Sequence, residues 1–153
     1  MPKYETTLID STTVAEGTMA FRFARPPDFK FEAGQSMNVS LIDPPETDAK
    51  GNARTFSIVS APHEGELVVA TRMRDTAFKR VLRAMPAGGR MQLRGPAGKF
   101  TLEGADTRPA VFLAGGIGIT PFMSMSRQAA HDRLPRPPQV GRRLGLGAPP
   151  TTR

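Results

Sequence analysis

Apolar and polar residues alternate along several short stretches of the first hundred positions. Residues 19–23 place an apolar side chain at every second position, and residues 37–41 repeat this spacing. Because strand side chains point alternately to two faces, each stretch predicts a strand with one apolar face. The alternating residues are Met19, Phe21 and Phe23, then Met37, Val39 and Leu41. Further strands are expected at 54–59, 66–73 and 90–94, a pattern typical of an antiparallel barrel or sandwich.

A spacing of three and four residues between the last two of these strands predicts a helix over 76–85. Its apolar residues form one stripe and are Phe78, Val81, Leu82 and Met85. Asp75 or Thr76 is the candidate N-cap, and Pro86 and Gly88 end the helix. The sequence GPAGKF at 95–100 predicts a tight turn that closes the barrel.

After residue 109 the pattern becomes that of an α/β protein. Residues 110–114 are continuously apolar, as in a strand buried on both faces within a parallel sheet. A glycine-rich turn follows, and Thr120 and Pro121 suit the N-cap and first position of a helix. Strand, turn and helix together form the first half of a βαβ unit.

Residues 133–153 contain five prolines, three glycines and no acidic or aromatic residue. Such a segment buries too little apolar area to offset its ordering entropy, so we expect disorder. An ordinary linker and an abnormal C-terminus, from a shifted reading frame or a truncated gene, both fit this composition.

The length of 153 residues suits about one domain with a real core. No apolar run is long enough to cross a membrane, and the polar N-terminus is not a secretory signal. We therefore expect a soluble, cytoplasmic protein. Because the chain has no cysteine and only two histidines, His63 and His131, we expect no disulfide and no metal site.

The net charge of +7 is concentrated at the C-terminal end of the chain. Residues 1–132 hold 16 of the 21 basic residues and all 14 acidic ones, which leaves +2 there and +5 in 133–153. A basic tail can attract polyanions, but no aromatic residue follows Phe122 to stack on bases. The distribution argues against nucleic-acid binding.

Three segments are candidates for binding chemistry, and the first is the strand RTFSIVSAP at 54–62. Arg54 and Phe56 lie on one side of this strand, with Ser57 next along the backbone. An arginine fork suits a phosphate, and an aromatic ring offers a flat apolar contact. The alternative is an ordinary surface arginine beside a satisfied hydroxyl.

The second segment is the start of the helix at 76–85. Its free backbone N–H groups form an anion site, and Arg72, Arg74 and Lys79 surround it. Asp75 opposes an anion at this position, and a capped surface helix is the alternative interpretation.

The third segment is the glycine turn GGIGITP at 115–121, where the backbone can approach a ligand closely. It does not match the dinucleotide fingerprint G-x-G-x-x-G, and no acidic residue lies about 20 positions further on. A purely structural strand–helix turn is the alternative.

The order of these motifs is more specific than any one of them. The series RxFSxxS, a helix-bearing connection, GPxGxF and FLAGGIGITPF resembles the ferredoxin–NADP reductase superfamily over roughly residues 5–131. The resemblance implies a mainly β fold, a six-stranded antiparallel Greek-key barrel with one helix that binds FAD, or FMN in some members. The incomplete start of an α/β nucleotide-binding domain follows. The implied divisions are a flavin-binding barrel at 1–104, the truncated start of an NAD(P)-binding domain at 105–132, and a basic tail at 133–153.

The resemblance also implies the binding residues. Arg54 contacts the flavin phosphate, Phe56 packs on the flavin where the family more often has tyrosine, and Ser57 bonds near its reactive edge. The remaining implied cofactor contacts are Thr55, Thr71, Arg72, Met73, Thr76, Ala77, Phe78, Lys79, Gly115, Gly116, Gly118 and Thr120. Thr120 lies near the junction of nicotinamide and flavin.

The implied function is a flavin-dependent NAD(P)H oxidoreductase that passes electrons to an acceptor such as an iron–sulfur or oxygenase partner. Hydride transfer needs no protein acid or base, and we identify no catalytic residue. Two alternatives stay open. One is a flavin-binding electron-transfer module without its own NAD(P)H site, and the other is a non-catalytic fragment.

Overall fold

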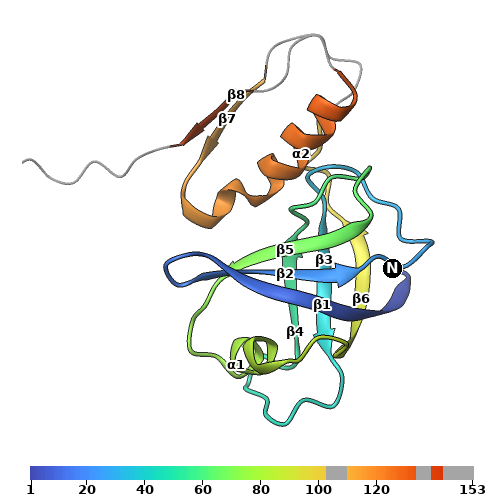
Figure 1. The fold of residues 1–153 in the computed structure, drawn as a ribbon, viewed down its shortest axis with the longest axis vertical. Coiled ribbons are helices and arrows are strands. Elements are labelled where there is room, and N and C mark those ends of the chain that lie inside the picture. Colours follow the sequence, from blue (N-terminus) through green and yellow to red (C-terminus); the bar gives the residue numbers. More distant parts are fainter. Residues whose placement is uncertain (103–109, 134–138, 143–153) are drawn as a thin grey trace, which may run out of the picture.

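The computed structural model describes residues 1–102, 110–133 and 139–142. Six antiparallel strands form one sheet in the order β4-β3-β6-β1-β2-β5 (Figure 1). The strands are β1 (Lys3–Ala15), β2 (Thr18–Ala24), β3 (Ser36–Leu41), β4 (Ala53–Ser57), β5 (Glu66–Arg72) and β6 (Arg90–Ala97).

The two edges of this sheet meet just after β4. The backbone N–H of Val59 donates to the carbonyl of Val68 in β5 at 2.8 Å. The N–H of Val68 in turn donates to the Ser60 hydroxyl at 3.0 Å. These bonds close the sheet into a barrel, which confirms the predicted six-stranded Greek-key fold.

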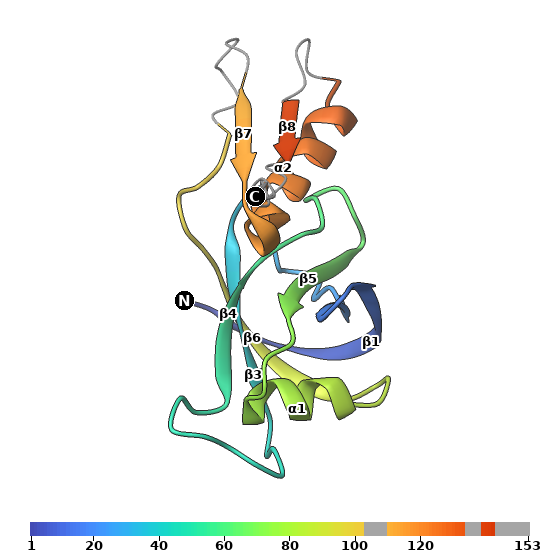
Figure 2. The ribbon, with the colours of Figure 1, turned by 90° about the vertical axis from the view of Figure 1, so that its left-hand side faces the viewer.

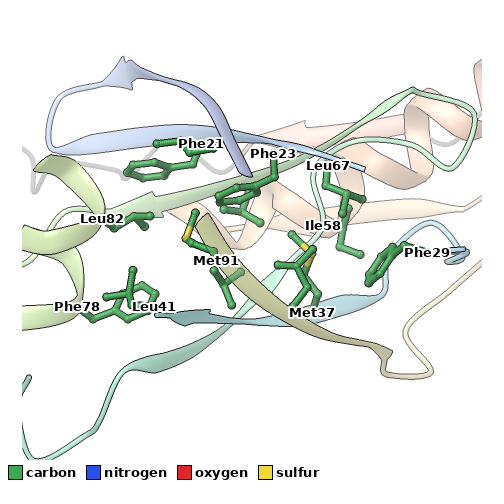
Figure 3. Packing of buried hydrophobic residues seen from close by; sticks show 14 of the residues in the cluster. Phe21, Phe23, Phe29, Met37, Leu41, Ile58, Leu67, Phe78, Leu82 and Met91 are labelled. Carbon is green, nitrogen blue, oxygen red and sulfur yellow. The ribbon is translucent and has the colours of Figure 1, made fainter. Parts of the chain in front are cut away.

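The barrel interior is filled by the apolar residues that the alternation singled out (Figure 3). Phe21, Phe23, Met37 and Val39 are fully buried, and Leu41 is nearly so. The alternation did not predict β1, because threonine residues interrupt the apolar positions on its inward face. Thr6 nevertheless points inward, where its hydroxyl donates to the carbonyl of Ala24 at 2.5 Å.

Helix α1 (Ala77–Ala84) closes one end of the barrel and is shorter than expected. Phe78, Val81 and Leu82 face the core, as the apolar stripe predicts. Thr76 occupies the N-cap position in extended conformation, but its side chain makes no capping hydrogen bond. The expected turn at 95–100 begins within β6, which continues to Ala97.

The C-terminal segment consists of β7 (Val111–Ala114), the 3₁₀ turn η1 (Gly116–Ile119), α2 (Thr120–His131) and β8 (Gln139–Arg142). Figure 1 places it at the end of the barrel opposite α1. Thr120 is not the N-cap, because η1 precedes α2 and leaves that position to Ile119.

Two predictions for this segment were wrong. β7 is buried on one face only, since Val111 and Leu113 are 70% and 82% exposed while Phe112 packs on Phe122 of α2. Disorder was expected throughout 133–153, but residues 139–142 form β8, which pairs in parallel with β7. The rest of the predicted tail, 134–138 and 143–153, lies outside the described residues.

Helix α2 is fastened to the barrel along one face. The Ser124 hydroxyl donates to the carbonyl of Ser60 at 2.6 Å in a buried position. One turn further, the Gln128 side chain accepts from the backbone N–H of His63 at 3.2 Å. These contacts place the glycine turn before α2 beside β5. Among the described residues, no helix has the length and apolarity needed to cross a membrane.

Candidate functional site

A cleft of about 550 Å³ lies where β4, β5, the start of α1 and the glycine turn meet. Figure 2 shows these elements on the side facing the viewer. The cleft brings together parts of all three segments that the sequence marked as candidates. Its lining residues are Lys50, Arg54, Thr71, Arg72, Arg74, Thr76, Lys79, Gly115, Gly116 and Ile117.

The described residues that line this cleft include five with positive side chains and none with a carboxylate. The clustered positive charge changes the pKa of Lys79. Its pKa is lowered first by desolvation, and then by the nearby charges of Arg74 and Arg54. A bound anion reverses the electrostatic part of this shift, so the cleft favours a negatively charged ligand.

The start of α1 adds hydrogen-bond donors to this charge. The Thr76 hydroxyl is buried and has no hydrogen-bond partner among the described residues. It lies at the helix N-terminus, where the first backbone N–H groups lack intrahelical partners. A buried unsatisfied hydroxyl beside a helix N-terminus fits a phosphate group.

The glycine turn forms the opposite wall of the cleft. A Cβ added to Gly115 would meet no atom within 4 Å, so this backbone is open to a ligand. Gly116 has φ +54°, a left-handed conformation that favours glycine, and lies next to the Arg72 guanidinium. The turn therefore allows close approach of a ligand at this wall.

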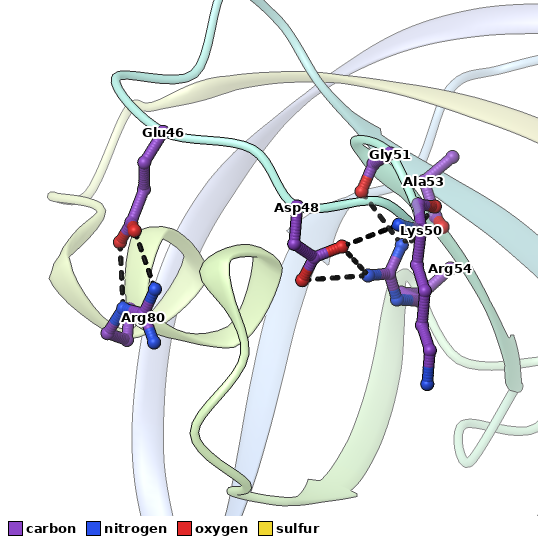
Figure 4. Close-up of polar contacts among 7 residues, drawn as sticks. All are labelled: Glu46, Asp48, Lys50, Gly51, Ala53, Arg54 and Arg80. Carbon is purple, nitrogen blue, oxygen red and sulfur yellow. Dashed lines mark hydrogen bonds and ion pairs between the residues drawn. The ribbon is translucent and has the colours of Figure 1, made fainter.

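Arg54 enters the cleft from β4, and the 42–52 loop holds its guanidinium (Figure 4). Nη1 donates to the carbonyls of Lys50, Gly51 and Ala53 at 2.7–2.9 Å. Nη2 lies 3.1 Å from the carboxylate of Asp48. The guanidinium carbon also lies 5.2 Å from the centre of the Phe78 ring, so the group packs between α1 and the loop.

The chain is similar in sequence to two curated proteins. It is 36% identical over 109 residues to methane monooxygenase component C of Methylosinus trichosporium, covering 70% of this chain and 30% of that protein. It is 33% identical over 111 residues to ferredoxin–NADP reductase B of Sorangium cellulosum, covering 71% and 44%. The chain thus spans less than half the length of either relative. No family model matches it.

Solved structures give the same result for the fold. A ferredoxin NADP⁺ reductase of Neisseria gonorrhoeae with bound FAD and NADP superposes with a TM-score of 0.72 at 24% identity, covering 86% of this chain and 53% of that one. Phthalate dioxygenase reductase superposes with a TM-score of 0.75 at 22% identity, covering 92% and 43%. The chain therefore has the fold of the ferredoxin–NADP reductases and is similar in sequence to one of them.

The structure places the predicted site residues in two groups. Arg54, Thr71, Arg72, Thr76 and Lys79 line the cleft together with Gly115 and Gly116. Phe56 and Ser57 lie half-buried beside it on β4. The Phe56 ring lies 6.0 Å from that of Phe78, so both rings lie on the same side of β4 as Arg54.

The other predicted residues do not line this cleft. Thr55 points away, where its hydroxyl accepts from Asn38 at 3.3 Å. Ala77 and Phe78 are buried beneath the cleft, and Met73 lines a neighbouring hollow of about 370 Å³. Gly118 is absent from the lining, and Thr120 is buried with its hydroxyl donating to Ile117.

Sequence reasoning missed Lys50, which lines the cleft, and Asp48, which binds Arg54. Both belong to the polar loop between β3 and β4. The spacing of charged residues in that loop offered no periodic signal, because their positions depend on the path of an irregular segment.

A larger cleft of about 1150 Å³ lies between the outer face of β2 and β5 and the C-terminal segment. Ala20, Val68 and Ala70 form much of its apolar wall. Arg72, Gly116 and Ile117 line both clefts, so the two adjoin at the glycine turn.

Proposed function

We propose that this chain is the flavin-binding part of a flavin-dependent NAD(P)H oxidoreductase, with FAD phosphates in the cationic cleft. The observation that carries the proposal is the cleft itself. It gathers five positive side chains and the unpartnered Thr76 hydroxyl from segments far apart in the sequence. The division into a barrel at 1–104 and a nucleotide-binding start at 105–132 is part of the same proposal.

The residues act by position and charge. Lys79, Arg72 and the first N–H groups of α1 neutralise the phosphates, and Arg54 supplies a fork for one of them. Phe56 gives the flavin ring a flat apolar contact, and Ser57 supplies a hydroxyl at its edge. When bound, the flavin supplies the redox chemistry, and the protein supplies orientation and electrostatics.

The open glycine turn is the proposed approach for NAD(P)H. Gly115 leaves room beside the cleft, and Thr120 fixes the start of α2 through its bond to Ile117. The acceptor class is an iron–sulfur or oxygenase protein, in line with the monooxygenase component and dioxygenase reductase among its relatives.

The test is the visible absorption of the purified chain after loading with FAD and removal of free flavin by gel filtration. A retained yellow band that bleaches anaerobically with NADH or NADPH is the expected result. A band that persists with both donors identifies a flavin module without its own hydride donor. A chain that is folded by circular dichroism and retains no flavin overturns the proposal.

A further inference from the structure

The Asp48 carboxylate lies against the Arg54 guanidinium that the proposed function assigns to a phosphate. Its Oδ1 is 3.1 Å from Arg54 Nη2, and its Oδ2 is 3.5 Å from the same nitrogen (Figure 4). The remaining arm of the fork, Nη1, is occupied by three carbonyls of the same stretch of chain. A phosphate therefore meets an arginine whose two terminal nitrogens are already engaged.

Asp48 also contacts backbone donors that suit a phosphate. The N–H of Lys50 donates to Oδ1 at 2.9 Å. The pKa of Asp48 is lowered first by this bond, then by Arg54 and by the backbone N–H of Ala77 in the first turn of α1. One carboxylate thus takes one terminal nitrogen of an arginine and a loop N–H close to the start of α1, and donors of this kind also bind phosphate.

From this arrangement we propose that Asp48 is an intramolecular competitor for the phosphate site and that the 42–52 loop is an autoinhibitory lid. The proposal rests on the proposed function, since it concerns the same cleft. A phosphate ligand displaces the carboxylate from Arg54 and moves the loop outward. The free energy of that displacement lowers the apparent affinity of the site.

The attachments of the loop are suited to such a movement. Besides Asp48 and the carbonyls of Lys50 and Gly51, which contact Arg54, the loop is held by Glu46, whose carboxylate accepts from Arg80 of α1 at 2.6 and 2.9 Å. Both ion pairs are partly or largely exposed, and exposed pairs are weak. The ends of the loop are fixed by hydrogen bonds between Leu41 and Asn52 at 2.8 and 2.9 Å. The segment between these ends can open while the barrel stays intact.

The opposite role for Asp48 gives a different result. If the carboxylate holds Arg54 in the orientation that binds phosphate, its removal weakens binding. If it competes with phosphate, its removal strengthens binding. The sign of the change therefore decides between the two.

The experiment compares Asp48→Asn with the wild-type chain. FAD binding is followed by quenching of flavin fluorescence, and inorganic pyrophosphate binding by calorimetry, at low and high salt. Asp75→Asn is the matched control, because Asp75 lies at the start of the same helix, is 88% exposed and pairs with Arg80 instead of Arg54. Arg54→Gln reports on the site itself, and thermal unfolding checks that each variant is folded.

We expect Asp48→Asn to bind FAD and pyrophosphate about tenfold more tightly, and Asp75→Asn to change affinity less than threefold. Unchanged or weaker binding by Asp48→Asn, with Arg54→Gln still losing affinity, overturns the lid and leaves the proposed function standing. If the folded wild-type chain and every variant bind neither ligand, the proposed function has failed and the lid fails with it.

Discussion

Replacing Lys79 by methionine should weaken flavin binding without weakening the fold. The Lys79 ammonium donates to the carbonyl of Arg72 at the edge of the cleft. Its pKa is lowered by desolvation and by Arg74 and Arg54, so the folded protein without ligand disfavours the charge. Methionine keeps a similar length and removes that charge. The free energy of unfolding of the ligand-free chain should therefore stay the same or rise.

The binding effect has the opposite sign. A hydrogen bond between an ammonium and a phosphate contributes about 1.5–3 kcal/mol, and every 1.4 kcal/mol is about tenfold in affinity. Lys79→Met should therefore weaken FAD binding roughly 10- to 100-fold. Because the ligand stabilises the ammonium, affinity in the wild-type chain should also fall as pH rises toward the lowered pKa of Lys79, and this dependence should vanish in the variant.

The assay is a fluorescence titration of FAD from pH 7 to 10, with urea unfolding of each ligand-free protein. Lys30→Met is the matched control, because it removes one charge from an exposed lysine outside the cleft lining. Equal affinities for Lys79→Met and wild type would refute the placement of the phosphates. A large loss of stability in Lys79→Met would refute the interpretation of its pKa.

Three further predictions concern stability. Phe78→Ala removes a ring that is 1% exposed and packs under Arg54 and Phe56. The free energy of unfolding in urea should therefore fall by about 3–5 kcal/mol, and a fall of less than about 1 kcal/mol would contradict this packing. Ser124→Ala leaves the buried carbonyl of Ser60 unpaired and should cost about 1–3 kcal/mol, with faster hydrogen exchange in α2. Ser126→Ala is the control and should be nearly neutral, because the Ser126 hydroxyl has no hydrogen-bond partner within the described part of the chain. The pKa values of three carboxylates are lowered in the folded protein: Asp10 by Arg22, Glu46 by Arg80 and Asp48 by the Lys50 N–H. Their contribution to the free energy of unfolding is therefore present above the unfolded pKa of about 4 and is lost as pH falls through the folded values. Urea midpoints should therefore decline below about pH 4, and a flat profile from pH 5 to 2 would contradict these pairs.

The sequence predicted those elements whose burial alternates regularly. Phe21 and Phe23 lie in the core because period-two spacing and burial on one face are the same constraint. The helix stripe at Phe78, Val81 and Leu82 is predictable for the equivalent reason at period 3.6. β1 was harder, since the buried Thr6 reads as polar until its partner carbonyl on β2 is known.

Contacts that depend on the path of a loop could not be predicted from the sequence. Nothing in the spacing of Asp48 and Arg54 distinguishes an ion pair from two solvated charges, because their meeting depends on the turn at Gly51, where φ is +70°. The one-sided burial of β7 likewise depends on which elements cover it. The order of the motifs did indicate the cleft, because β4, the start of α1 and the glycine turn are adjacent in this fold.

The charges of the cleft and the position of Asp48 have one physical explanation. Five cations in one cleft repel one another. The pKa of Lys79 is lowered first by desolvation and then by the charges of Arg74 and Arg54, so repulsion adds to the cost of its charge in the ligand-free fold. A carboxylate at Arg54 relieves part of it and satisfies donors that a phosphate would otherwise take. The same substitution that frees the site for a ligand should therefore destabilise the empty protein, since Asp48→Asn removes a counterion from this cluster. Tighter binding together with a lower unfolding midpoint is the combination expected if the carboxylate substitutes for phosphate.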